Sequence, residues 1–422
     1  MPHTSERTDL TSYLLGERSE LRALIEAISV AADDEARQRA AFEYLLVLAT
    51  ARLAASGEPP EARALAQVRA QYTKVFTHDE SEHASLIKEL HSSLHSGVAV
   101  SVLTALKLLA LFHRKNARYE LARASFAVAS RLADRIGDPL EMLNALFWLG
   151  VAERYLGHLE RAEEVHNEQL GLARKFGQSG QAVLAQENLG LVALRRGQVG
   201  EARKRVMRAL NEAQQLEDQE LQGYCHHALM LVETEAGRPG EAASFGWEAY
   251  TRYESVDQRL RALQDCAVIL YESGIFDAAE AAWEIILDTA KDSATMIRCK
   301  IGLIDIATQL EQQERFAQLA ADVMDEPRLA SMPLELLEAH RSVGLGYVAF
   351  GEVDRARIHL MRGLAVARDN GYESEASQIS DTLRDLTGSV PRIQPADVPE
   401  GEVARLEDVG RSIKAEWERR CA

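Results

Sequence analysis

Apolar residues recur every three to four positions along most of this chain, which is the period of an α-helix with one buried face. Runs of alternating β-branched residues, which would indicate strands, are few. Alanine, leucine, glutamate, glutamine and arginine dominate, and only 10 of the 422 residues are proline, so the composition also favours helix. The pattern predicts an all-α protein.

A glycine–alanine motif divides the predicted helices into repeats. The glycine stands five positions before the alanine, with an acidic residue between them, and the motif recurs at Gly157–Ala162, Gly197–Ala202, Gly237–Ala242, Gly274–Ala279 and Gly351–Ala356. The first steps are similar in length, and the last is about twice as long because it spans two repeats, with a degenerate copy at 311–320. A further copy at Ala122 has Ala117 in place of the glycine. Internal repeats of this length are typical of helical solenoids.

Each position of the motif has a physical reason. The glycine falls between two predicted helices, where the chain turns through a left-handed conformation that glycine adopts without steric cost. The alanine allows two helices to approach closely. Another small residue precedes the glycine by seven positions at Gly150, Gly190 and Gly344, and we expect it to be the matching contact on the first helix. These positions explain packing rather than function.

The segments 146–165, 186–206 and 341–360 resemble the tetratricopeptide repeat, a helix–turn–helix unit of about 34 residues with small residues at this spacing. The resemblance extends over positions 100–388, or about seven repeats. It implies a right-handed superhelical solenoid of stacked helix–turn–helix repeats. The repeats in this chain are longer, at about 37–40 residues, and need longer helices. In this they are similar to bacterial regulators such as the sensor arms of transcription activators and the peptide-binding regulators of quorum sensing.

This frame predicts four segments along the chain. Residues 1–98 show helical apolar spacing and are expected to form an N-terminal helical bundle or cap. Residues 99–388 hold the repeats. Residues 389–402 contain prolines and no apolar periodicity, so they are predicted to be a linker. Residues 403–422 are expected to form a C-terminal helix that either caps the last repeat or binds a partner.

Charge and targeting signals limit the class of protein. The formal net charge is −17 and the isoelectric point about 5.3, which argues against direct, nonspecific binding of nucleic acid or anionic membranes. No window has the continuous apolar run of a membrane span, and the first residues lack the regions of a signal peptide. The four cysteines are dispersed, without a CxxC pair. We therefore expect a reduced, cytoplasmic protein.

Few residues suggest chemistry. His91 and His95 have the spacing of a metal-binding pair on a helix, but two imidazoles do not complete a site, and His83 is turned well away from His95 on the same predicted helix. The segment 224–227 places cysteine beside two histidines, but adjacent helical residues point about 100° apart and do not converge. No nucleotide-binding loop or helix-turn-helix DNA reader is evident. We expect no catalytic residues, no metal and no cofactor.

The resemblance to tetratricopeptide repeats implies a binding groove lined by the first helix of each repeat. Transferring the family's ligand-facing positions to this sequence predicts a groove that is basic and aromatic in the early repeats and of mixed character in the later ones. Such a groove would bind an extended peptide with its acidic end towards the early repeats. Asn144 is suited to holding a peptide backbone because an amide both donates and accepts hydrogen bonds. The predicted site residues are Lys107, Arg114, Lys115, Asn144, Phe147, Arg154, Tyr155, Glu187, Asn188, Arg195, Tyr224, His227 and Tyr271.

The function predicted from these features is a non-enzymatic scaffold, adaptor or regulator of bacterial type that holds a protein or peptide in its groove. Four alternatives remain open, one of which is an enzyme with a hidden metal site. Residues 1–98 would be an effector bundle acting on a response-regulator-like partner. The convex face or the C-terminal helix would build a structural assembly, including a homo-oligomer. Alternatively, the exposed groove residues only keep the surface soluble.

Overall fold

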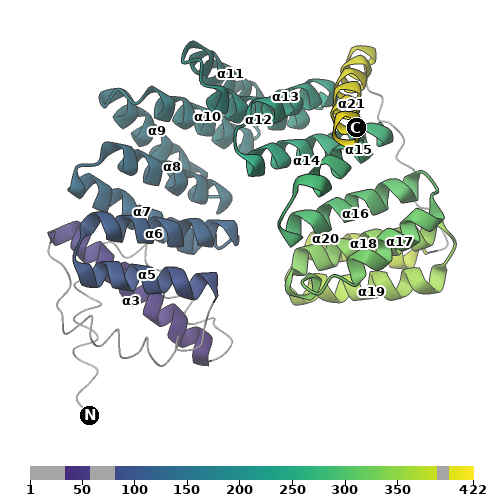
Figure 1. Ribbon diagram of the computed structural model, residues 1–422, viewed down its shortest axis with the longest axis horizontal. Helices are drawn as coiled ribbons and strands as arrows, with labels where there is room; N and C mark the ends of the chain where they lie inside the picture. Colours follow the sequence, from purple (N-terminus) through teal and green to yellow (C-terminus); the bar gives the residue numbers. More distant parts are fainter. Residues whose placement is uncertain (1–33, 58–80, 387–398) are drawn as a thin grey trace. The chain divides into compact units, whose positions relative to one another are not determined.

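The computed structural model describes residues 34–57, 81–386 and 399–422, and within these ranges the chain is helical, with one short 3-10 turn and no strand (Figure 1). The predicted all-α class is confirmed for this part of the chain. Two compact units are formed by residues 1–216 and 217–422, called unit 1 and unit 2 below. None of the described helices is long and apolar enough to cross a membrane.

The described residues of unit 1 form two helices before the repeats and then three helix pairs. Consecutive helices pack against each other from α5 to α11, and α3 packs mainly on α7. The helices are α3 (Asp34–Ser56), α5 (Glu82–Ser96), α6 (Ala99–Lys115), α7 (Tyr119–Ile136), α8 (Pro139–Tyr155), α9 (Leu159–Lys175), α10 (Ser179–Arg195) and α11 (Val199–Gln215).

In unit 2, residues 217–386 and 399–422 form four more helix pairs and two further helices. Its helices also pack in chain order as far as α20. They are α12 (Gln219–Glu235), α13 (Pro239–Arg252), α14 (Val256–Glu272), α15 (Phe276–Thr289), α16 (Ser293–Gln309), α17 (Gln313–Met324), the 3-10 turn η2 (Leu329–Ser331), α18 (Pro333–Ala349), α19 (Val353–Asp369), α20 (Glu373–Arg384) and α21 (Glu400–Cys421). This succession of helix pairs is the repeated helix–turn–helix arrangement expected from the motif.

The predicted segments are covered unequally. Residues 1–33 and 58–80 of the predicted N-terminal bundle and residues 389–398 of the predicted linker lie outside the described residues. The division between the two compact units falls inside the predicted repeat region, after the third helix pair.

Aspartates cap three of the first helices. The side chain of Asp138 accepts a hydrogen bond from the Glu141 amide at 3.0 Å, at the start of α8, where Pro139 occupies the first turn. Asp218 and Asp292 cap α12 and α16 in the same way, at 2.9 Å. Each aspartate satisfies an amide that has no partner inside the helix and places a negative charge at the positive end of the helix dipole.

Left-handed residues end the first helix of each pair, as the motif predicts. At Gly197 the backbone φ is 73°, and the amides of Gly197 and Gln198 donate to carbonyls in the last turn of α10 at 2.8 and 3.0 Å. In the two copies without glycine, Ala117 and Glu311 adopt the same conformation, with φ values of 55° and 57°. A side chain in this conformation is strained, so the turn is imposed by the repeat even where the sequence does not favour it.

Small residues on the first helix allow the two helices of a pair to touch. A Cβ atom added to Gly190 on α10 would lie 2.5 Å from Val206 Cγ2 and 3.2 Å from the Ala202 carbonyl oxygen on α11. Gly150 meets His166 in the preceding pair, and Gly344 meets Leu360 near the end of the chain. The residue that fills the space of the glycine is thus the one a turn beyond the motif alanine, and it belongs to the same pair.

The C-terminal helix α21 packs on α13 and α15. Its apolar face buries Leu406, Val409 and Ile413. Glu402 on α21 accepts a hydrogen bond from the Glu241 amide at 3.0 Å, in the first turn of α13. The helix therefore lies against the second helices of the first two pairs of unit 2, whereas a C-terminal cap was expected to lie on the last repeat.

Removing the strain at Ala117 should stabilise the protein. Ala117→Gly is expected to raise the free energy of unfolding by about 0.5–1 kcal/mol, because the relief of left-handed strain exceeds the entropy cost of glycine. Gly157→Ala, at the equivalent turn of the next pair, should lower it by a similar amount. Urea unfolding followed by circular dichroism measures both changes, and equal effects of the same sign would contradict the explanation.

The close contact at Gly190 should tolerate no added methyl group. Gly190→Ala is expected to lower the free energy of unfolding by about 1–3 kcal/mol, because the new Cβ would overlap Val206 and approach backbone on α11. The matched control is Gly171→Ala on α9, where an added Cβ has no neighbour within 4 Å among the described atoms. There alanine should stabilise by about 0.5–1 kcal/mol through its helix propensity. A neutral result at Gly190 would show that the two helices can move apart freely.

Candidate functional site

The first helices of unit 1 lie side by side and are joined by their side chains. Lys107 of α6 forms an ion pair with Glu141 of α8. The Gln181 side-chain amide of α10 donates to Asn144 Oδ1 of α8 at 2.8 Å. We call the surface formed by α6, α8 and α10 the first-helix face. It contains ten of the thirteen predicted site residues.

Arg114 is positioned on this face by an aromatic ring. Its guanidinium carbon lies 4.3 Å from the centre of the Trp148 ring, so α6 and α8 are joined by a cation–π contact. Phe147 meets Trp148 edge to face, with 4.7 Å between the ring centres. These contacts hold the guanidinium in place without removing its charge.

Arg154 and Tyr155 form a second cation–aromatic group at the end of α8. The guanidinium carbon of Arg154 is 5.0 Å from the centre of the Tyr155 ring. The Tyr155 ring also stacks in parallel on Tyr119, with the ring centres 4.6 Å apart. Tyr155 remains 37% exposed, so a ligand on this face can touch a ring whose orientation is already fixed.

Glu187 lies buried beside Arg154. Burial raises the pKa of Glu187, and the nearby Arg154 charge and a hydrogen bond from Asn188 offset this only in part, so that the pKa is about 8. Asn188 Nδ2 donates to Glu187 Oε2 at 2.6 Å and to the Leu184 carbonyl at 3.1 Å. Near neutral pH, Glu187 is mostly protonated and does not cancel the charge of Arg154.

Asn144 is the last member of a chain of polar side chains. His166 Nδ1 is 3.1 Å from Gln169 Oε1, Gln169 Nε2 donates to Gln181 Oε1 at 3.0 Å, and Gln181 donates to Asn144. Burial lowers the pKa of His166 to about 4, so its ring is neutral and donates from Nδ1 in this chain. Because the Asn144 oxygen accepts an internal bond, its amide NH₂ is the group best suited to a ligand.

The other predicted residues have varied environments. Lys115 and Arg195 are exposed at the ends of α6 and α10. In unit 2, His227 is buried, with its ring nitrogens 3.3 Å from the Tyr253 hydroxyl and 2.8 Å from Asp265. The three predicted residues of unit 2 are Tyr224 and His227 on α12 and Tyr271 on α14.

Aromatic contacts and burial also constrain Tyr224 and Tyr271. Tyr224 meets Tyr253 edge to face, with 5.2 Å between the ring centres. Burial and the Asp305 charge raise the pKa of Tyr271, so its hydroxyl stays protonated at physiological pH. Both rings are half-buried. They therefore offer ring edges and a neutral hydroxyl group rather than a charge.

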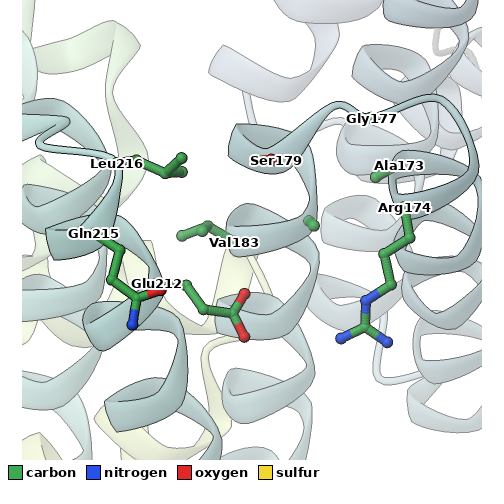
Figure 2. Close-up of a pocket in the computed structure, with 9 residues that line it drawn as sticks. Ala173, Arg174, Gly177, Ser179, Val183, Glu212, Gln215 and Leu216 are labelled. Carbon is green, nitrogen blue, oxygen red and sulfur yellow. The ribbon is translucent and has the colours of Figure 1, made fainter.

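A separate pocket in unit 1 lies between the end of α9, the start of α10 and the end of α11 (Figure 2). Figure 2 shows Arg174 on one side of the pocket and Gln215 on the other, with Val183 between them. None of the thirteen predicted residues lines this pocket. It is a shallow feature of the helix ends, distinct from the first-helix face.

Several residues that shape the first-helix face were not predicted. The transfer of family positions selected ligand-facing residues, so it passed over Trp148 and Gln181, which position Arg114 and Asn144. It also passed over Tyr119, which lies on α7, the second helix of its pair. The periodicity that identifies a helix face does not show which neighbouring side chain orients a ligand-facing residue.

A polar cluster between the helices before the repeats and the first repeat was also missed. Glu43 of α3 contacts His113 Nε2 of α6 at 2.5 Å and His83 Nε2 of α5 at 3.1 Å. Burial raises the pKa of Glu43, but the charges and hydrogen bonds of the two histidines outweigh burial and lower it to about 2. Glu43 is therefore ionised throughout the physiological range.

No protein-family model and no curated protein matches the sequence. Solved structures show likeness to the chain, and the following three are among them. A Rap protein in complex with Competence and Sporulation Factor is 12% identical, with 82% of this chain and 97% of that chain covered and a TM-score of 0.44. The Rap conjugation regulator of plasmid pLS20, in complex with the Phr* peptide, is 13% identical, with 82% and 98% covered and a TM-score of 0.45. BtubC from P. vanneervenii is 15% identical, with 48% and 86% covered and a TM-score of 0.38.

Replacing Glu187 should change the pH dependence of stability. The carboxyl has a pKa of about 8 in the folded protein, against an ordinary value of 4.5. Between these values the native state keeps a proton that the unfolded chain loses, so rising pH destabilises the wild type through this window. Glu187→Gln cannot ionise and keeps an acceptor for Asn188.

The substitution should therefore have little effect at pH 4 and should raise the free energy of unfolding by about 2–4 kcal/mol at pH 8. Urea unfolding at a series of pH values measures the difference between the two proteins. Glu168→Gln, an exposed substitution of the same chemistry on α9, is the control. A difference that does not grow between pH 4 and pH 8 would contradict the assignment.

Proposed function

We propose that unit 1 binds an acidic, extended peptide segment on the first-helix face and acts as a non-enzymatic scaffold or regulator. The observation that carries this proposal is the pair Arg114 and Arg154. Each arginine lies against an aromatic ring, and both reach the same face from neighbouring repeats. Guanidinium groups bind carboxylates through two parallel hydrogen bonds.

The environment of the two arginines favours binding of an anion. Lys107 already pairs with Glu141, so it contributes less to a ligand. Glu187 is mostly uncharged below pH 8 and leaves the charge of Arg154 in place. Lys115 and Arg195 are exposed and add positive potential, which speeds the approach of an acidic chain although the whole protein is acidic.

Preorganisation supports binding of a peptide rather than of a free ion. Phe147 and Tyr155 provide ring surface beside the arginines, and aromatic residues with arginine are enriched among residues that dominate binding energy. Side chains already held by neighbours lose less entropy when a ligand binds. The Asn144 side-chain amide lies on α8 of the same face and can donate to a peptide carbonyl.

The wider role follows the resemblance to long-helix bacterial regulators. We infer a cytoplasmic regulator or adaptor whose partner is a protein or peptide, with no direct nucleic-acid or membrane ligand. Assembly through the C-terminal helix is disfavoured by its structure, because Leu406, Val409 and Ile413 are buried against the same chain. An effector role for residues 1–98 is a separate hypothesis, tested by phosphate release from a phosphorylated response regulator.

A displayed library of random heptapeptides tests the proposal directly. The full-length protein should enrich peptides with Asp or Glu. Arg114→Ala and Arg154→Ala should each weaken binding of the best peptide about 10-fold or more, the usual effect of removing a dominant arginine. Fluorescence polarisation with a labelled copy of that peptide measures the affinity.

Arg208→Ala on α11 is the matched control, since it removes an exposed arginine from a second helix and should leave binding unchanged. Unfolding midpoints confirm that all variants fold. A wild-type protein that enriches no peptide, or arginine variants that bind as tightly as the wild type, would exclude the first-helix face as the binding site.

A further inference from the structure

Three side chains from separate helices converge outside the repeat motif. They are Glu43 on α3, His83 on α5 and His113 on α6. One ligand-type atom from each lies within 4.8 Å of the others. The three residues lie far apart in the sequence, so no local spacing brings them together, and only the packing of the three helices forms the cluster.

We propose that Glu43, His83 and His113 form a binding site for a divalent transition-metal ion such as Zn²⁺. Imidazole nitrogen and carboxylate oxygen are established zinc ligands, and two histidines with one carboxylate leave a fourth position for water. The same donors suit Co²⁺ and Ni²⁺, whereas Mg²⁺ prefers oxygen ligands. The site is independent of the proposed peptide-binding face.

The three donor groups lie close together. Both imidazoles turn Nε2 towards Glu43, at 2.5 Å for His113 and 3.1 Å for His83, so each histidine faces a different oxygen of one carboxylate. Small movements would open these contacts to the separation of about 3.3 Å between ligand atoms in tetrahedral zinc, which follows from bonds of about 2.0 Å. The cluster thus has the donor set and nearly the spacing of a three-ligand site.

The surroundings restrict the motion of the rings. The His83 ring stacks on Phe112 with 5.0 Å between ring centres and 11° between planes. The His113 ring stands almost perpendicular to His83, at 5.4 Å and 79°. Because both orientations are fixed by neighbouring rings, little order has to be gained when an ion binds.

Two of the three ligand side chains are buried, and the third is partly exposed to solvent. His113 is fully buried and the Glu43 side chain is 3% exposed, while the His83 side chain is 20% exposed. Water can therefore reach the cluster from the side of His83 and supply the fourth ligand. A dication would also balance the negative charge of the buried Glu43 carboxylate.

The second ring nitrogen of His113, Nδ1, indicates how firmly a metal ion would be held. This atom is buried and has no hydrogen-bond partner among the described residues. Metal-bound histidines usually donate from this second nitrogen, and loss of such a partner weakens metal binding about 10–100-fold. We therefore expect an ion that exchanges during purification, so the metal must be supplied in the experiment.

Bound metal would have a structural effect. The site joins α3 to α5 and α6, so an ion would tie the helix that precedes the repeats to the first repeat pair. An ion that binds only the folded arrangement stabilises it by mass action. The unfolding midpoint of the chain should therefore rise with the concentration of Zn²⁺.

The test uses the full-length chain without a purification tag, freed of metal by a chelator. Equilibrium dialysis against ZnCl₂ should show one zinc per chain. CoCl₂ should give the visible absorption bands of four-coordinate Co²⁺, and MgCl₂ at the same concentrations should not bind. Glu43→Gln and His83→Gln should each lower the zinc affinity about 10-fold or more.

His95→Gln is the matched control, because it removes an exposed histidine from the same helix as His83. It should keep the affinity and the rise in unfolding midpoint of the wild type, whereas His83→Gln should lose both. Circular dichroism without metal shows whether the variants fold. If Glu43→Gln does not fold, the partly exposed His83→Gln variant decides the question.

Two results would overturn the site. One is the absence of stoichiometric zinc binding by the wild type, which would leave a hydrogen-bonded cluster that serves packing alone. The other is zinc binding that survives Glu43→Gln and His83→Gln but falls in His95→Gln, which would move the ion to the His91–His95 pair suggested by the sequence spacing.

Discussion

The close approach of two helices at a glycine is the contact on which several of the repeats depend. Gly150, Gly190 and Gly344 leave space on the first helix, and His166, Val206 and Leu360 fill it from the second helix of the same pair. This contact fixes the rotation of the first helix about its axis. In unit 1 it therefore decides which residues of α8 and α10 are buried and which form the first-helix face.

Tight packing also determines the electrostatics of that face. Glu187 is almost fully removed from water, and this desolvation raises its pKa more than Arg154 lowers it. The face thus keeps positive charge in a chain with a net charge of −17. The rings of Trp148 and Tyr155 orient Arg114 and Arg154 on this face. The face is therefore locally positive, although the whole chain is negatively charged.

The sequence predicts what repeats and misses what does not. A fixed glycine–alanine spacing is enough to place helices and turns, including the strained turn at Ala117. The docking of α21 depends on contacts between residues such as Glu402 and Glu241, far apart in the chain and outside the repeat frame. The cluster of Glu43, His83 and His113 likewise needs three helices in place, and helical spacing suggested His91 and His95 instead.

Departures from the repeat pattern connect packing to the candidate site. Val206 and Leu360 occupy the space beside their glycines with apolar side chains, but the equivalent residue in the second repeat is His166. This polar residue begins the hydrogen-bond chain that ends at Asn144 on the first-helix face. The neutral His166 ring can donate from Nδ1 only because Gly150 leaves room for it. The packing contact between Gly150 and His166 therefore also sets the orientation of the Asn144 amide, which is available to a ligand.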